Sequence, residues 1–164
     1  MPPRWNVKPP KDDGEYFERM TKSLFTAGLN WSVVEKKWPG FQKAFAGFSP
    51  VKVAPLSERE VKALMNDAGI VRNERKIRAT VYNAGEFLKL QKQYGSFRKY
   101  LDGFEKDEER LMSDLRERFQ HLGVSTARTF LWSVGYPLTP NSEEKKWMAA
   151  ISRKPVQDAL RFRL

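Results

Sequence analysis

Cysteine is absent from the 164 residues, and His121 is the only histidine. Disulfide bonds, thiolate nucleophiles and a zinc site built from cysteine and histidine are therefore excluded. A serine nucleophile activated by histidine would have to use His121. Apolar runs long enough to span a membrane are also absent, as is a signal-peptide pattern. We therefore expect a soluble, cytoplasmic protein with no membrane partner.

The charge is one-sided, because 30 lysine and arginine residues stand against 20 aspartate and glutamate residues, for a net charge of +10. This balance favours a polyanionic partner, and nucleic acid is the first candidate. An anionic membrane surface is the alternative. It ranks lower because no basic amphipathic segment carries a Trp/Phe face separate from the predicted core.

Helix-capping residues stand at almost every break in the apolar pattern, and only residues 51–54, a very short stretch, suggest a strand. We therefore predict an all-α fold of about eight to ten helices with short loops. A proline-rich, basic arm is expected at residues 1–11, followed by a single helical domain at 12–164. The predicted helices cover residues 13–27, 30–37, 39–47, 58–66, 74–94, 97–101, 107–121, 126–134 and 143–151.

Residues 119–135, FQHLGVSTARTFLWSVG, read as the end of one helix, a bend at 122–125 and a second helix. Gly123 can adopt backbone angles closed to other residues, and Ser125 or Thr126 can cap the second helix. The first N–H groups of that helix then point outward and form an anion site, for which we expect a DNA phosphate. The alternative is an ordinary corner between two helices. The predicted DNA contacts here are Leu122, Gly123, Val124, Ser125, Thr126 and Arg128.

A second basic segment is GIVRNERK at residues 69–76, where a loop leads into a helix. Cations at the start of a helix oppose the helix dipole, and an external anion would relieve that repulsion. Arg72, Asn73 and Lys76 are therefore predicted phosphate contacts. A solvated basic surface is the alternative.

Most aromatic residues are expected in the core, and Trp31 is the exception. It follows the break at residues 27–29, close to a helix start, where a cleft could open. The carboxylates show no diagnostic spacing; Glu18 and Glu35, from neighbouring turns, are the candidate pocket acids. His121 beside the bend is read as a helix-end cation rather than a catalyst.

Several segments together resemble the 3-methyladenine DNA glycosylase I family, within the helix-hairpin-helix glycosylase superfamily. The resemblance covers roughly residues 5–136. It implies two helical lobes around a cleft, a helix-hairpin-helix unit at 107–135, and excision of N-methylated purines after base flipping. Trp31 matches the tryptophan of the family's base pocket, with Phe25 and Ser23 as neighbouring base contacts. The segments are AGLNW at 27–31, VVEKKWPGFQKAFAGFSPVKVA at 33–54, DAGIVRNERKI at 67–77, YNA at 82–84 and LGVSTARTFLWSVG at 122–135.

The chain departs from the family pattern at several positions. The family's pocket glutamate, eight residues before the tryptophan, is replaced by Ser23, and its glutamine is replaced by Thr26. The family's Cys/His zinc site cannot form, so no metal or cofactor is expected. The family's N-terminal pocket aromatics lie before the matched segment. The superfamily's catalytic aspartate has no match, and residues 140–144 are the nearest polar stretch.

Three hypotheses follow. The first is a monofunctional glycosylase for alkylated purines of the 3-methyladenine type, acting as a nucleoid-associated monomer on duplex DNA with alkylated or abasic lesions. The second is a catalytically weak or inactive, damage-recognising DNA-binding protein on the same scaffold, which the Ser23 replacement favours. The third is a helical protein-interaction module whose charge serves another purpose.

Overall fold

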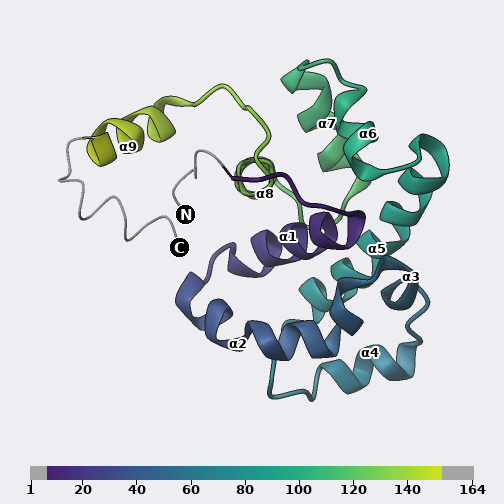
Figure 1. Cartoon of the computed structure of the whole chain (residues 1–164). Coiled ribbons are helices and arrows are strands. Elements are labelled where there is room, and N and C mark those ends of the chain that lie inside the picture. The colour runs from purple at the N-terminus through teal and green to yellow at the C-terminus, as the bar shows by residue number, and fades with distance from the viewer. Residues whose placement is uncertain (1–6, 153–164) are drawn as a thin grey trace.

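The computed structural model describes residues 7–152, and every regular element in that part of the chain is helical (Figure 1). The all-α prediction is confirmed. The predicted arm at residues 1–11 and domain at 12–164 stay predictions, because residues 1–6 and 153–164 lie outside the described part. The elements are α1 (Asp13–Thr26), α2 (Trp31–Ala44), η1 (Ala46–Phe48), α3 (Pro50–Val53), α4 (Glu58–Leu64), α5 (Glu74–Tyr94), α6 (Phe97–Asp102), α7 (Glu108–Arg118), α8 (Val124–Ser133) and α9 (Ser142–Ser152).

Side-chain caps fix the starts of α1, α2, α4 and α6 within one residue of the predicted helix starts. Asp12, Asn30, Ser57 and Ser96 each accept a hydrogen bond from an amide in the first turn. At Ser57 the capping box with Glu60 is complete. Each cap contributes roughly 1 kcal/mol and depends only on residues within one turn, which explains why the sequence predicts it well.

Helix α1 runs through the centre of the molecule and contacts α2, α3, α5, α6 and α8 (Figure 1). Its Phe17 and Phe25 rings are fully buried. The ring centroid of Phe17 lies 5.4 Å from that of Phe87 in α5, and that of Phe25 lies 4.7 Å from that of Phe41 in α2. Burying one such ring contributes about 1.5–3 kcal/mol. Aromatic packing therefore joins the central helix to the groups of helices on either side of it.

Two local predictions were wrong, at Pro39 and at the end of α7. Pro39 does not open a new helix but lies inside α2, on an exposed face where the carbonyl group that loses its partner can bind water. Residues 51–54, too short to count as a predicted strand, lie mostly within α3, in agreement with the all-α prediction. Helix α7 ends at Arg118 rather than at residue 121, because Phe119 adopts an extended conformation with φ −101° and ψ 146°.

The hairpin bend also differs from its prediction. Gly123 has φ −74°, an angle open to any residue, and the left-handed residue is His121 with φ +57°. Helix α8 begins at Val124, so Ser125 and Thr126 lie in its first turn and do not cap it. The N-cap is Gly123, which has no side chain to bind the first amides.

No helix within residues 7–152 combines the length and the apolar character needed to cross a membrane.

Candidate nucleic-acid interface

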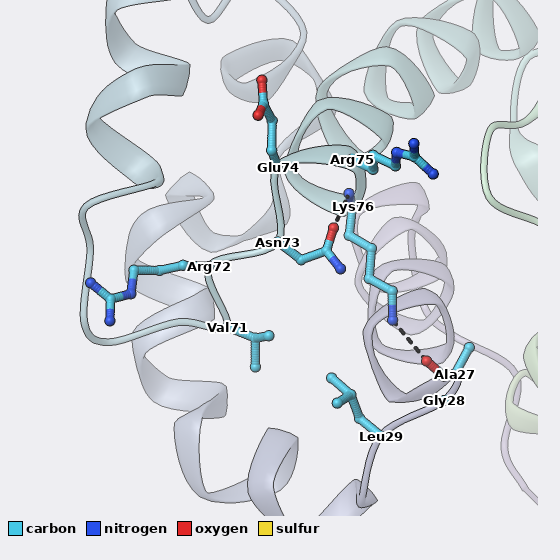
Figure 2. Close-up of a pocket in the computed structure, with 9 residues that line it drawn as sticks. All are labelled: Ala27, Gly28, Leu29, Val71, Arg72, Asn73, Glu74, Arg75 and Lys76. Atoms are coloured by element: carbon cyan, nitrogen blue, oxygen red, sulfur yellow. Dashed lines mark hydrogen bonds between the residues drawn. The ribbon is translucent and has the colours of Figure 1, made fainter.

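Two segments far apart in the sequence form the walls of one groove of about 720 Å³ (Figure 2). The first wall is the loop after α1, residues 27–29. The second is the loop before α5 together with the first turn of α5, residues 71–76. The two walls belong to the AGLNW and GIVRN motifs, which the fold brings together.

Lys76 joins the two walls. Its Nζ donates hydrogen bonds to the carbonyl oxygen of Ala27 at 2.8 Å and to that of Phe25 at 3.3 Å. Figure 2 shows the side chain reaching across from α5 to the end of α1. An ammonium group is favourable there because the last carbonyl groups of a helix carry partial negative charge. Burial lowers the pKa of Lys76 below its usual range. Lys76, predicted to contact phosphate, thus binds the backbone of the opposite wall.

A close backbone approach holds the second wall in place. A Cβ atom on Gly40 of α2 would lie 2.1 Å from the carbonyl oxygen of Gly69, so only glycine fits at this point. Asp67 accepts a hydrogen bond from the Gly69 amide at 2.8 Å, and Lys37 donates one to the Ala68 carbonyl at 2.9 Å. The loop that leads into the groove is therefore fixed against α2.

The groove carries an excess of positive charge. Arg72 and Arg75 are exposed, and Figure 2 shows their side chains pointing to opposite sides. The one carboxylate in the lining, Glu74, accepts a hydrogen bond from Arg78 at 3.1 Å. Asn73 caps α5 by accepting from the Lys76 amide at 3.1 Å. The N-terminus of the long helix α5 adds partial positive charge, so this groove favours an anionic ligand such as a phosphate.

Trp31 is the first residue of α2, two residues after Leu29 of the groove wall, and does not itself line the groove. Its side chain is 52% exposed, and its neighbours Leu29 and Val33 are exposed to a similar degree. Leu29 also lines the groove. An exposed indole beside an anion-binding groove offers a flat surface on which a nucleobase can stack.

The other predicted pocket residues lie elsewhere. Ser23 is buried, and its hydroxyl group donates to the Arg19 carbonyl of its own helix at 3.0 Å. The other predicted base contact, Phe25, is fully enclosed in the core. A hydrogen bond of 3.5 Å joins the Trp38 indole to Glu18, and Glu35 forms an ion pair with Lys22 at 2.6 Å. The structure does not bring these four residues into the groove lining.

The hairpin presents an uncapped helix start. Val124 and Ser125 are exposed, whereas Leu122 is buried and anchors the bend. Because the N-cap is Gly123, the first amides of α8 receive no side-chain cap, in contrast to those of α1, α2, α4, α5, α6 and α7. Such amides can bind a phosphate from DNA.

Arg128, predicted to face DNA, is directed toward the start of α9. Its Nε donates to Glu144 at 3.0 Å, and an Nη group donates to the Thr139 carbonyl at 2.8 Å. The Trp132 indole donates to the same carboxylate. The arginine side chain is only 16% exposed. This ion pair attaches the segment after the hairpin to α8.

Sequence reasoning missed Asn83, which binds the backbone beside the hairpin. It lies on the buried face of α5 with Ile77, Ala84 and Phe87. An amide on this mainly apolar helix face is the signal that could have found it, because buried polar groups need hydrogen-bond partners. Gly40 was also missed, since no local pattern shows which backbone segment will approach a glycine.

Comparison with known proteins agrees with this arrangement. Residues 3–132 match the family model described as methyladenine glycosylase. The chain is 36% identical over 100 residues to DNA-3-methyladenine glycosylase 1 of Escherichia coli (strain K12), and 32% identical over 97 residues to DNA-3-methyladenine glycosylase of Haemophilus influenzae. These matches cover 61% and 59% of this chain. A solved structure of 3-methyladenine DNA glycosylase I from Staphylococcus aureus superposes with a TM-score of 0.73 at 29% identity, covering 80% of both chains.

The helical fold and the two motifs that meet in the groove are thus those of a glycosylase-type protein. The chain belongs to the methyladenine glycosylase family, whose model matches most of its length. It spans about half the length of the curated relatives it matches, 53% and 52% respectively.

Proposed function

We propose that the protein is a monofunctional DNA repair glycosylase that hydrolyses the N-glycosidic bond of alkylated purines of the 3-methyladenine type. One observation carries the proposal: segments of the two motifs form the walls of a single basic groove, and the exposed Trp31 follows two residues after Leu29 of one wall. The solved structure of the Staphylococcus aureus protein describes the recognition of 3-methyladenine by that protein. The fold, the charge and the groove support the same substrate class here.

Hydrolysis of this glycosidic bond requires few catalytic groups from the protein. A purine methylated at N3 carries a positive charge, so its bond to C1′ of the sugar is already weak. When that bond breaks, the electron pair neutralises the departing base, and no strong general acid is needed. Water then attacks C1′ and loses a proton to solvent. The product in the DNA is an abasic sugar. The protein must extrude the nucleotide, hold the base and admit water.

Each part of the interface has a task in this reaction. Trp31 stacks on the extruded base, and an indole facing a cation contributes about 0.5–2 kcal/mol in favour of the damaged form. Arg72 and the start of α5 bind phosphate beside the lesion. The first amides of α8 bind the backbone at a second place. Lys76 keeps the two walls of the groove together.

The replacement of the family's pocket glutamate by Ser23 weakens the pocket's ability to discriminate between bases. Its hydroxyl group donates within α1, so it supplies neither a carboxylate nor a donor to the base edge. We therefore expect weaker discrimination than in a typical family member, or a preference for another alkylated base.

The test is incubation of the full chain with methylated duplex DNA, followed by chromatography of the released bases. Release of 3-methyladenine, 7-methylguanine or a related base above the protein-free background is the expected result. If the protein binds the methylated DNA but bases are released no faster than without protein, the enzymatic proposal is wrong.

A second function, damage recognition without catalysis, is favoured by the lining of the groove. Its only carboxylate, among the described residues, is Glu74, which is bound to Arg78. Salt-dependent binding to abasic or alkylated duplex without base release would establish this alternative. Lack of any DNA binding at moderate salt would instead favour a protein-interaction module.

We further propose that the protein acts as a monomer on duplex DNA in the cytoplasm, in association with the nucleoid. Light scattering coupled to size exclusion, with and without a short duplex, tests the monomer.

A further inference from the structure

A buried asparagine in the middle of α5 binds the backbone that leads into the hairpin. Asn83 is 2% exposed. Its Oδ1 accepts from the amide of Gln120 at 2.8 Å, and its Nδ2 donates to the carbonyl oxygen of Gln120 at 3.2 Å. One carboxamide therefore satisfies both backbone groups of a residue 37 positions away. A side chain that binds one residue twice fixes both the position and the orientation of that backbone.

Two more side chains of α5 hold the residues immediately before Gln120. A carboxylate oxygen of Glu86 lies 3.5 Å from Nη1 of Arg118. The ring of Phe87 packs against that of Phe119, with centroids 5.5 Å apart. One face of α5 thus holds three consecutive residues at the end of α7.

The residue after Gln120 needs such support. His121 has φ +57°, a left-handed conformation that costs free energy for a residue other than glycine. This turn directs the chain through the buried Leu122 to Gly123, where the uncapped helix α8 begins. The direction of the α8 amides therefore depends on a strained turn that follows directly on the residue bound by Asn83.

The same helix reaches the groove at its other end. Asn73 caps α5 and Lys76 joins the groove walls, whereas Asn83 lies further along the helix. Because a helix is stiff over this length, α5 keeps the groove and the hairpin at a fixed separation. A ligand that touches both sites requires that separation to be constant.

We propose that Asn83 is a positioning residue for DNA binding: it locks the left-handed turn at His121 and thereby aims the first amides of α8 at a DNA phosphate. This inference rests on the proposed binding of duplex DNA. Asn83 itself does not touch the ligand. The alternative is that Asn83 only satisfies hydrogen bonds inside the fold.

The experiment measures binding of the full chain to a fluorescent duplex with one stable abasic-site analogue, by anisotropy at several salt concentrations. The variant Asn83→Leu keeps the size of the side chain and removes both hydrogen bonds to Gln120. We expect its affinity to fall about tenfold, with a shallower salt dependence. Each phosphate charge that is no longer neutralised makes the slope of log K against log salt less steep by about 0.9, and the loss of a contact made by uncharged amides changes it by less than that. Hydrogen exchange without DNA should show faster exchange of the Gln120 amide.

Thr80→Val is the matched control, since Thr80 is fully buried on the same helix and donates to the Lys76 carbonyl at 2.8 Å. It removes a buried hydrogen bond without touching the hairpin, so its affinity should stay within twofold of that of the original protein and its salt slope should not change. The double variant Asn83→Leu/His121→Gly should recover part of the lost affinity, because glycine adopts the left-handed turn without strain.

Unchanged affinity and salt slope in Asn83→Leu would overturn the positioning role and leave the proposed function intact. An equal loss in Thr80→Val at a matched melting temperature would also overturn it, because the effect would then be general destabilisation. If the unaltered protein does not bind duplex at all, both the proposed function and this role fail. In that case the Gln120 exchange data still show whether the contact between α5 and the bend forms.

Discussion

Glu144 of α9 binds Arg128 of α8, with Nε of the arginine 3.0 Å from the carboxylate. The sequence predicted Arg128 as a DNA contact, but the ion pair holds its side chain against the protein. The Trp132 indole donates a hydrogen bond to the same carboxylate. The ion pair makes the segment after the hairpin part of the fold. It also keeps one positive charge away from the surface on which DNA is proposed to bind.

The first prediction concerns the pH dependence of this pair. Burial raises the pKa of Glu144, but hydrogen bonds from Arg128, the Asn141 amide and Trp132 outweigh it, so the pKa lies below its usual range. The stabilisation is therefore complete above the ordinary carboxyl pKa of about 4.3 and is lost as the pH falls below it. Glu144→Gln should lower the melting temperature by a few degrees near pH 7, and the difference should shrink below about pH 4.

Thermal melts of both proteins between pH 3 and pH 8 check this prediction. Glu143→Gln is the control, because Glu143 is exposed at the neighbouring position. A difference that is independent of pH would show that the carboxylate charge does not stabilise the attachment of α9.

The second prediction concerns two glycines in helices. Gly40→Ala should destabilise the protein by about 1–3 kcal/mol, because its Cβ atom would meet the Gly69 carbonyl at 2.1 Å. Gly85→Ala in α5 meets nothing within 4 Å and should stabilise by about 0.5–1 kcal/mol through its helix propensity. Urea denaturation compares the two. Equal effects of the two substitutions would contradict the close approach of α2 to the groove loop.

The third prediction separates recognition from stability at Trp31. Trp31→Ala should change the free energy of unfolding by no more than about 0.5 kcal/mol relative to the unaltered protein, since the side chain is half exposed. Release of methylated bases should fall at least tenfold through the loss of stacking. Val33→Ala, a neighbouring exposed residue, should alter neither quantity. Unchanged base release by Trp31→Ala would remove this residue from the proposed base site.

The fourth prediction distinguishes two cations of the groove. Arg72→Ala should weaken duplex binding and reduce its salt slope by about 0.9 without altering stability, because Arg72 is exposed. Lys76→Met should lower stability by about 1 kcal/mol as well as binding, since its ammonium group holds the Ala27 carbonyl. Anisotropy titrations and denaturation curves together check the pair. Equal stability losses in both variants would contradict the proposal that Lys76 joins the groove walls and that Arg72 only binds phosphate.

Much of the fold could be predicted because it depends on short-range interactions. Asp12, Asn30, Ser57 and Ser96 cap helices through contacts within one turn, and such contacts are visible in a single stretch of sequence. Aromatic residues at helical spacing predicted the core for the same reason. Trp31 was correctly separated from that core, because it follows a break at a helix start.

The rest required contacts between distant residues. Pro39 continues α2 because its face is exposed, and the strained angle falls on His121 because the neighbouring backbone is bound by Asn83. The carboxylate that binds Arg128 lies 16 positions away, and the carbonyl groups that bind Lys76 lie at least 49 positions away. The sequence by itself shows where the basic residues stand. Helix packing decides whether each of them points toward DNA or toward a carboxylate or carbonyl group of the protein, because packing determines which partner lies within hydrogen-bond distance.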